Sequence, residues 1–288
     1  MRIFLIILSN TFALTCNAQD LKLFHMVSSH TSFPDSARLN GQLYDSVVYE
    51  VTSHYQDSSI LLIVPSHLNA KSRINMVFWF HGWHNNIDSA AIRYDLLRQF
   101  ANTKKNAVLV LAETAKDAPD SYGGKLEKPG VFKKLVKDII LNLKNERCIP
   151  ANSEVGNVIL AGHSGAYRVM AYILDNGGIQ VQEVILFDAL YAETDKFIVW
   201  MQSHKTHCFI NMYTDNGGTE EETFRMMKQL KENGISYQNT EEATLTRNQI
   251  EENRILFIHT AQQHNDIINN PDHFRLFIEL CPFLASMK

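Results

Sequence analysis

From residue 76 onward, short apolar runs alternate with segments of helical periodicity, and this alternation restricts the possible folds more than any other feature of the chain. The apolar runs cover residues 76–80, 107–111, 158–161, 184–187, 208–212 and 255–258. The helical patterns cover residues 90–103, 132–145, 166–175, 195–203, 220–231 and 272–284. Strands rich in Val, Ile and Leu that alternate with helices predict an α/β fold, with a mostly parallel central sheet and helices on both of its faces. A binding site is expected at the carboxyl ends of the strands.

The preceding part of the chain has a different pattern. Residues 45–55 and 59–65 alternate between apolar and polar side chains and are separated by a polar turn, which predicts an N-terminal antiparallel hairpin. The sequence shows no internal repeat, low-complexity tract or Pro/Ser linker. We therefore expect residues 20–288 to form a single domain.

The first nineteen residues have the pattern of a secretory signal peptide. One positive charge at Arg2 is followed by an apolar stretch, then by polar residues and the small residue Ala18. Cleavage is expected near Ala18 or Gln19, so the mature protein is predicted to be secreted or periplasmic. A lipoprotein anchor at Cys16 is disfavoured by the bulk of Thr15. We expect no stable membrane insertion after cleavage.

Composition excludes some partners. The chain is 45% hydrophobic and 20% charged, with a formal net charge of −4, as expected for a globular protein with a large core. No basic patch with interleaved aromatic residues occurs, so nucleic acid is not an expected partner. Cys148, Cys208 and Cys281 would remain after cleavage. Their spacing predicts no metal site, and whether two of them form a disulfide stays open.

The segment Val-Ile-Leu-Ala-Gly-His-Ser-Gly-Ala (residues 158–166) joins an apolar strand to a helical pattern. Small residues, Gly162 and Ala166, stand two positions either side of Ser164. A sharp strand-to-helix turn requires this, because larger side chains would collide when the central residue is held in a strained conformation. The pattern predicts a nucleophile elbow with an exposed Ser164 hydroxyl. The alternatives are a helix N-cap or an inactivated elbow, since Ala166 replaces the usual last glycine.

Further chemical groups follow other predicted strands. The sequence Phe-His-Gly-Trp-His-Asn-Asn follows the strand at 76–80, and Asp188 and Asp215 each follow later strands. His259 and His264 come at and after the last strand. This order of hairpin, His-Gly loop, elbow serine, acid and late histidine resembles the α/β-hydrolase superfamily over nearly the whole mature chain.

The resemblance implies a role for each group. A serine hydroxyl needs a positioned base, and the superfamily carries it in the loop that contains His264, with His259 as the alternative. The acid is expected to be Asp188, because no turn chemistry surrounds it, with Asp215 as the alternative in a turn-forming Asp-Asn-Gly-Gly segment. The backbone amides of Gly165 and of Trp83 or Gly82 are expected to form the oxyanion hole.

The remaining candidates concern substrate recognition. His84 beside Trp83 is expected to border the acyl pocket. A long loop at residues 115–127 places Asp120, Ser121, Tyr122 and Lys125 at the same edge of the sheet, where they could recognise a polar substrate such as a sugar, or simply be solvated. Only about twenty residues separate Asp188 from the next strand, too few for a large helical lid.

Together these features predict an extracytoplasmic serine hydrolase of ester or amide bonds, with a small-molecule or polymer-borne substrate and with neither a cofactor nor a metal. His81 and His84 are too few ligands for a metal-dependent hydrolase. The alternative from another class is a secreted binding protein that retains the fold without the chemistry.

Overall fold

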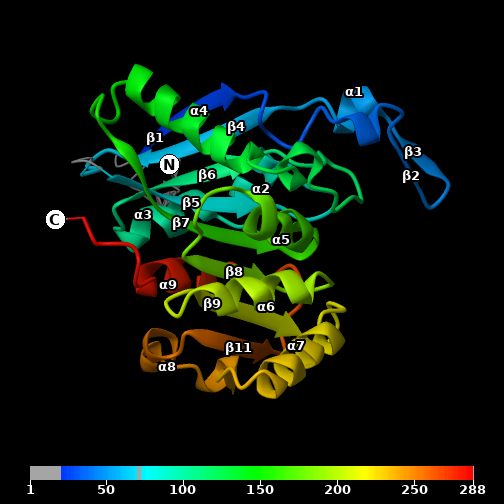
Figure 1. Ribbon diagram of the computed structural model, residues 1–288, viewed down its shortest axis with the longest axis vertical. Coiled ribbons are helices and arrows are strands. Elements are labelled where there is room, and N and C mark those ends of the chain that lie inside the picture. The colour runs from blue at the N-terminus through cyan, green and yellow to red at the C-terminus, as the bar shows by residue number, and fades with distance from the viewer. Residues whose placement is uncertain (1–20, 70–72, 288) are drawn as a thin grey trace, which may run out of the picture.

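The computed structural model describes residues 21–69 and 73–287. The predicted signal peptide lies outside these residues. Within them, a nine-stranded sheet has the order β1-β4-β6-β5-β7-β8-β9-β11-β10, and every neighbouring pair from β6 to β10 is parallel. Only β4 runs against its two neighbours. The predicted α/β fold with a mostly parallel sheet is confirmed (Figure 1).

The strands of this sheet are β1 (Leu21–Val27), β4 (Ser59–Pro65), β5 (Arg73–Phe80), β6 (Ala107–Ala112), β7 (Glu154–His163), β8 (Glu183–Phe187), β9 (Cys208–Thr214), β10 (Gln238–Glu241) and β11 (Ile255–Thr260). The α-helices are α1 (Val51–His54), α2 (Ile87–Arg93), α3 (Leu96–Thr103), α4 (Val131–Asn145), α5 (Tyr167–Asn176), α6 (Thr194–Ser203), α7 (Glu220–Glu232), α8 (Arg247–Glu252) and α9 (His273–Leu280).

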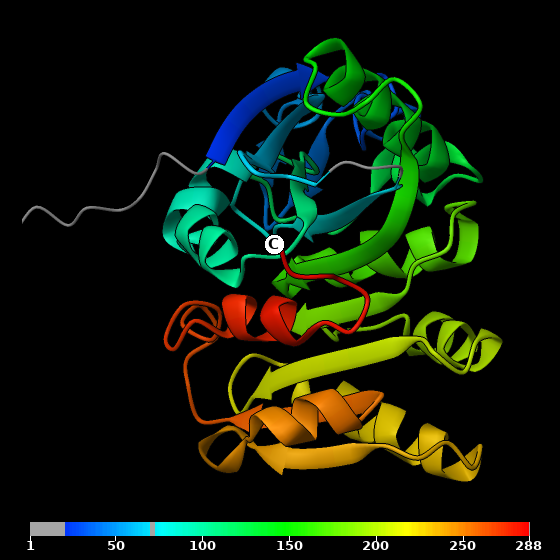
Figure 2. The ribbon, with the colours of Figure 1, turned by 90° about the vertical axis from the view of Figure 1, so that its left-hand side faces the viewer.

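Side-chain alternation along the strands divides the core into two layers. On β5, Met76, Phe78 and Phe80 pack into the layer under α4, α5, α6 and α7, whereas Val77 and Trp79 pack into the layer under α2, α3 and α9. Figure 2 shows the sheet between these two groups of helices. Because successive side chains on a strand point to opposite faces, a strand that is apolar throughout must be covered on both sides.

The predicted N-terminal hairpin is wrong in its pairing. The strand β4 pairs antiparallel with β1, a strand that the pattern did not indicate. Residues 45–55 do not form one strand: β3 (Val47–Tyr49) pairs with β2 (Gln42–Tyr44) in a separate two-stranded sheet, and α1 follows. The β2–β3 hairpin stands away from the main sheet in Figure 1. Asp45 and Ser46 form its turn with positive φ angles of 46° and 64°.

The helical pattern at residues 90–103 is also divided. The helices α2 and α3 meet at Tyr94 and Asp95, and Asp95 has a left-handed backbone with φ +50°. This break lets both helices lie against the same face of the sheet.

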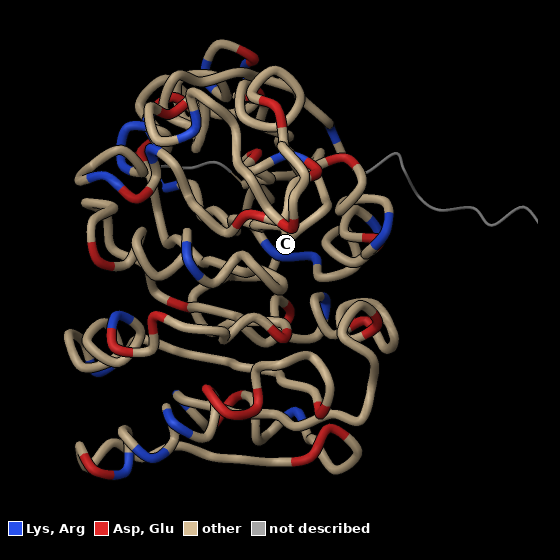
Figure 3. Tube along the Cα trace, turned by 90° about the vertical axis from the view of Figure 1, so that its right-hand side faces the viewer, with Lys and Arg blue, Asp and Glu red and all other residues tan. Residues whose placement is uncertain are grey.

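Charged residues are distributed without segregation by sign. Figure 3 shows Lys and Arg interspersed with Asp and Glu along the chain. The thiols of Cys148, Cys208 and Cys281 are unpaired. Among the described residues, no helix combines the length and the apolar character that crossing a bilayer requires.

Candidate active site

Ser164 occupies a strained turn at the end of β7. Its φ of +54° is a left-handed conformation that a non-glycine residue rarely adopts. A side chain at Gly162 would come within 2.6 Å of Met170 Sδ and 2.7 Å of Ala166 Cβ, so both flanking positions must stay small. The chain enters a 3-10 turn at Ser164–Ala166 and then α5. The structure thus has the sharp strand-to-helix turn that the sequence predicts around Ser164.

Asp188 and His264 are brought together at the same edge of the sheet. His264 Nδ1 lies 2.6 Å from Asp188 Oδ2. Asp188 is fully buried and also accepts hydrogen bonds from the Thr214 hydroxyl at 2.7 Å and from the Thr219 hydroxyl. Burial alone would raise the pKa of Asp188, but the hydrogen bonds from His264, Thr219 and Thr214 outweigh it and hold the pKa below its usual value. The Asp188 carboxyl group is therefore ionised and oriented toward His264.

The alternative residues pair with each other. His259 Nε2 lies 2.7 Å from Asp215 Oδ1, and His259 Nδ1 lies 2.7 Å from Glu241 Oε2. Burial lowers the pKa of His259, but hydrogen bonds to Glu241 and Asp215 outweigh it and raise the pKa overall. Asp215, Glu220 and His259 bring possible metal-ligand atoms within 4.8 Å of one another. Both nitrogens of His259 already face carboxylates. The ion pairs with Asp215 and Glu241 therefore explain why these side chains lie together, and no metal ion is needed to explain it.

His163, which the sequence reading did not single out, holds the His264 loop. Its Nε2 donates to the His264 carbonyl at 2.8 Å, and its Nδ1 contacts the Tyr94 hydroxyl at 3.1 Å. The two imidazole rings lie 4.4 Å apart. Burial and the neighbouring His264 lower the pKa of His163 to about 3. His163 directly precedes Ser164 in the chain, and its neutral ring binds the His264 backbone. It therefore holds the His264 loop beside the serine.

The loop after β5 lies against the elbow. A side chain added at Gly82 would come within 2.6 Å of Ser164 Cβ and 3.2 Å of the Gly165 nitrogen. Gly165 in turn abuts the Trp83 ring, because a side chain there would lie 2.6 Å from Trp83 Cδ1. Within the described part of the chain, the Trp83 backbone N–H has no hydrogen-bond partner. The backbone of Gly82 and Trp83 is therefore next to Ser164.

A pocket of about 210 Å³ opens in front of Ser164. Its lining consists of Trp83, Ser121, Ser164, Gly165, Tyr167 and Tyr191. Trp83 Nε1 donates to the Ser121 hydroxyl at 2.8 Å, which fixes one wall. Burial raises the pKa of Tyr191 to about 12, with nearby Asp188 adding to the effect and contact with Ser164 opposing it. Three aromatic side chains thus surround the serine.

The other predicted substrate-binding residues are engaged within the protein. Asp120 forms a two-point ion pair with Arg38, with Nε at 2.6 Å from the carboxylate. The Tyr122 hydroxyl donates to Asp35 at 3.0 Å, and Lys125 Nζ donates to the Ser29 carbonyl at 2.7 Å. Asp120 and Tyr122 border a void of about 10 Å³ and are absent from the lining of the pocket in front of Ser164. Of the four predicted loop residues, Ser121 is the one that lines the pocket in front of Ser164.

His84 is exposed at the rim of this region rather than in the pocket wall. Its backbone is left-handed with φ +51°, its N–H donates to the Ala118 carbonyl at 3.1 Å, and its ring lies 6.1 Å from that of Tyr49. The residue therefore helps to shape the loop after β5. It is not among the residues that line the pocket in front of Ser164.

A buried ion pair, also missed from the sequence, underlies the same loop. His81 and Glu113 are 4% and 1% exposed, and His81 Nε2 lies 2.5 Å from Glu113 Oε1. Burial disfavours an imidazolium, but the Glu113 carboxylate outweighs it and raises the pKa of His81. Glu113 directly follows the apolar strand β6, and a charged residue at that position is the sequence feature that could have indicated a functional residue.

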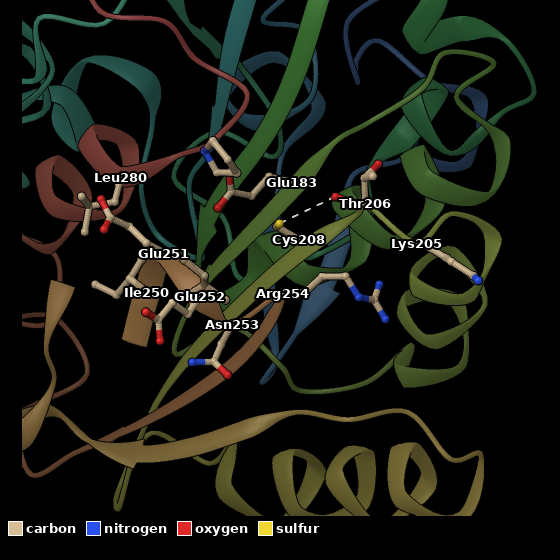
Figure 4. Close-up of a pocket in the computed structure, with 12 residues that line it drawn as sticks. Glu183, Lys205, Thr206, Cys208, Ile250, Glu251, Glu252, Asn253, Arg254 and Leu280 are labelled. Atoms are coloured by element: carbon tan, nitrogen blue, oxygen red, sulfur yellow. Dashed lines mark hydrogen bonds between the residues drawn. The ribbon is translucent and has the colours of Figure 1, made fainter. Parts of the chain in front are cut away.

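A second cavity, of about 200 Å³, lies at the opposite ends of the strands (Figure 4). Glu183 and Cys208, the first residues of β8 and β9, line it. Glu183 Oε2 is buried without a hydrogen-bond partner among the described residues, and burial raises the pKa of this carboxyl to about 7. This cavity is separated from the serine by the length of the sheet.

No family model matches the chain, and no curated protein does. Solved structures do match. One is a ferulic acid esterase with a TM-score of 0.55 and 8% identity, which covers 90% of this chain and 99% of its own. Another is a feruloyl esterase module from Clostridium thermocellum, complexed with sinapinate, with a TM-score of 0.53, 10% identity and coverage of 91% and 88%.

A third match is fluorophosphonate-binding serine hydrolase F of Staphylococcus aureus in its substrate-bound form. Its TM-score is 0.52 at 11% identity, and the match covers 91% of this chain and 99% of that one. Each of these three matches covers about nine tenths of this chain. At these identities, the likeness concerns the fold. The chain has the α/β-hydrolase fold.

Proposed function

We propose that this protein is an extracytoplasmic serine hydrolase that cleaves carboxylic esters through Ser164, His264 and Asp188. The observation that carries this proposal is the hydrogen bond between Asp188 and His264 beside a strained serine. Backbone strain of this kind persists where the surrounding structure enforces it, and it is concentrated at functional sites. A binding protein without the chemistry would need neither the strained serine nor the Asp188–His264 hydrogen bond.

In the proposed reaction, the Ser164 hydroxyl attacks the ester carbonyl while His264 Nε2 takes its proton. Nε2 has no hydrogen-bond partner among the described residues, so this nitrogen is free for the role. Ser164 and His264 share no hydrogen bond in the described structure, and such contacts commonly tighten only when substrate binds. Asp188 holds the histidine tautomer and stabilises the imidazolium.

The negative charge that develops on the carbonyl oxygen needs donors already aimed at it. The amides of Gly165 and Trp83 serve this purpose in the proposal, which is supported by the close approach of Gly82 to Ser164 and Gly165. The imidazolium then returns its proton to the leaving alcohol. Water, activated by His264, releases the acid from the acyl-enzyme.

The pocket favours a planar or apolar group over a sugar. Its walls are Trp83, Tyr167 and Tyr191, and the polar residues of the neighbouring loop are occupied by internal contacts. Aromatic walls contribute a large contact area and prefer offset or edge-on rings. Two of the structural matches are named feruloyl or ferulic acid esterases, which supports an aromatic acyl group. The proposed location outside the cytoplasm rests on the signal peptide that the sequence predicts.

A fluorophosphonate probe tests the nucleophile directly. We expect the wild-type protein to be labelled at Ser164, and the Ser164→Ala variant to be unlabelled and inactive on p-nitrophenyl acetate and on methyl esters of hydroxycinnamic acids. Matched melting curves would show that the variant is folded. A folded wild type that resists the probe and hydrolyses none of these esters would favour the alternative, a binding protein with this fold.

A further inference from the structure

The loop that carries the Trp83 amide rests on the buried pair His81 and Glu113. The strands β5 and β6 are parallel neighbours, with Trp79 opposite Leu111 in register. Two residues further along each strand, this register brings His81 opposite Glu113. Neither residue reaches the pocket in front of Ser164, so the reaction as described above leaves both of them without a role.

The contacts of His81 define its protonation. Nδ1 lies 2.8 Å from the Gly82 carbonyl oxygen, and Nε2 lies 2.5 Å from Glu113 Oε1. Nε2 also lies 3.0 Å from the Thr114 hydroxyl, which can accept as well as donate. Because a carbonyl oxygen and an ionised carboxylate only accept hydrogen bonds, each ring nitrogen donates to one of them. Glu113 also accepts from the backbone N–H of Ile87 and of Thr114, each at 3.2 Å. The pair is therefore an imidazolium and a carboxylate.

The Gly82 carbonyl belongs to the same peptide group as the Trp83 N–H. A donor on the carbonyl oxygen polarises the amide and strengthens its N–H as a donor, because hydrogen bonds in a chain reinforce one another in a low dielectric. That N–H is unpartnered among the described residues and lies beside Ser164. The chain of contacts runs from Glu113 through His81 to the peptide next to the nucleophile.

We propose that His81 and Glu113 are positioning residues that polarise the Gly82–Trp83 peptide toward the oxyanion. This inference rests on the proposed function, since it needs a reaction in which negative charge develops next to Trp83. The ion pair is oriented with its positive end toward that charge. Its effect is therefore larger on the transition state than on the bound ester.

Glu113→Gln separates charge from shape. The glutamine amide can donate to His81 Nε2 while Nδ1 still donates to Gly82, so the contacts from residue 113 to the Gly82 carbonyl survive without their charges, and the bond that Oε1 accepts from the Thr114 N–H is lost. We expect kcat on an activated ester to fall about tenfold, a part of the 10²–10³-fold effect of deleting a whole oxyanion donor, with KM within twofold. Affinity for a trifluoromethyl ketone, which forms a hemiketal oxyanion with Ser164, should fall by the same factor as kcat. Affinity for the matching methyl ketone should not change.

Glu183→Gln is the matched control. It makes the same substitution at another buried carboxyl, at the opposite ends of the strands. We expect it to leave kcat and ketone affinity unchanged. A second measurement does not depend on whether the Glu113→Gln variant folds. Nitrogen-15 spectra of the wild-type histidines at pH 8 should show His81 with protons on both ring nitrogens. The His81 signal is assigned by its loss in the His81→Asn variant.

Three results would overturn the inference. One is a neutral His81 at pH 8. Another is a Glu113→Gln protein that keeps kcat and trifluoromethyl ketone affinity within twofold. The third is a loss shared equally by both ketones and accompanied by a lower melting temperature, which would indicate a structural role only. A wild type that neither hydrolyses esters nor binds the trifluoromethyl ketone would instead refute the proposed function.

Discussion

At the scale of single residues, Asp188 and Asp215 differ in what they contact. Asp188 faces His264, and Asp215 faces His259 at an exposed site. We expect Asp188→Asn to lower turnover about 10⁴-fold, because an amide favours the wrong histidine tautomer. It should also lower the melting temperature, since the amide nitrogen would face donors such as Thr214. Ester turnover and thermal melts of the purified variant would measure both effects.

Asp215→Asn provides the comparison. It removes one carboxylate from His259, which keeps Glu241 as a partner, and exposed ion pairs contribute little to stability. Turnover should therefore stay within a few fold of the wild type. If Asp215→Asn abolished turnover and Asp188→Asn retained it, the assignment of the acid would have to be reversed.

At the scale of elements, the β2–β3 hairpin packs against one wall of the pocket in front of Ser164. Tyr44 on β2 packs edge-on against Trp83, with ring centroids 5.3 Å apart, and both rings are about two-fifths exposed. Removing Tyr44 frees one side of a pocket wall. We expect Tyr44→Ala to raise KM for hydroxycinnamate esters by roughly 2- to 10-fold, the value of one aromatic contact, and to leave KM for p-nitrophenyl acetate unchanged.

The hairpin contains its own control. Leu43 is the neighbour of Tyr44 on the same strand, so its side chain points to the opposite face, and it is 66% exposed. Leu43→Ala should leave KM for both esters unchanged. Equal changes in the Tyr44 and Leu43 variants would show that the hairpin acts through its overall conformation and that the contact with Trp83 is not what matters.

At the scale of the whole molecule, Glu183 links stability to pH. Its pKa is raised from 4.5 to about 7 by burial, so the folded protein binds a proton there that the unfolded chain has released. The contribution of this protonation to the free energy of unfolding is fully present below pH 4.5 and is lost as the pH rises through 7. Relative to wild type, Glu183→Gln should gain stability on the order of 3 kcal/mol at pH 8.5 and little at pH 5.

Urea unfolding of wild type and Glu183→Gln at both pH values measures this difference, and the other titrating groups cancel because the two proteins share them. A stability difference that is the same at pH 5 and pH 8.5 would show that Glu183 does not titrate in this range. Activity is not expected to change, because the carboxyl lies at the strand ends remote from Ser164.

Local patterns determined the parts of the protein that depend on near neighbours. The alternation of apolar runs and helices predicts the parallel sheet, because periodicity reflects which side chains are buried within each element. The turn at Ser164 depends on the small size of Gly162 and Ala166, because larger side chains at these two positions would collide. The two positions lie within five consecutive residues, so the sequence alone reveals this condition. The order of groups along the chain also led to Ser164, His264 and Asp188 as candidates.

Tertiary structure alone decided which groups meet. The pairing of β4 with β1 joins residues far apart in the chain, and register between β5 and β6 places His81 on Glu113. Two aspartates and two histidines could be matched in more than one way from the sequence. Strand order assigns Asp188 to His264, because distances between elements are set by packing and are not encoded in the pattern of any single segment.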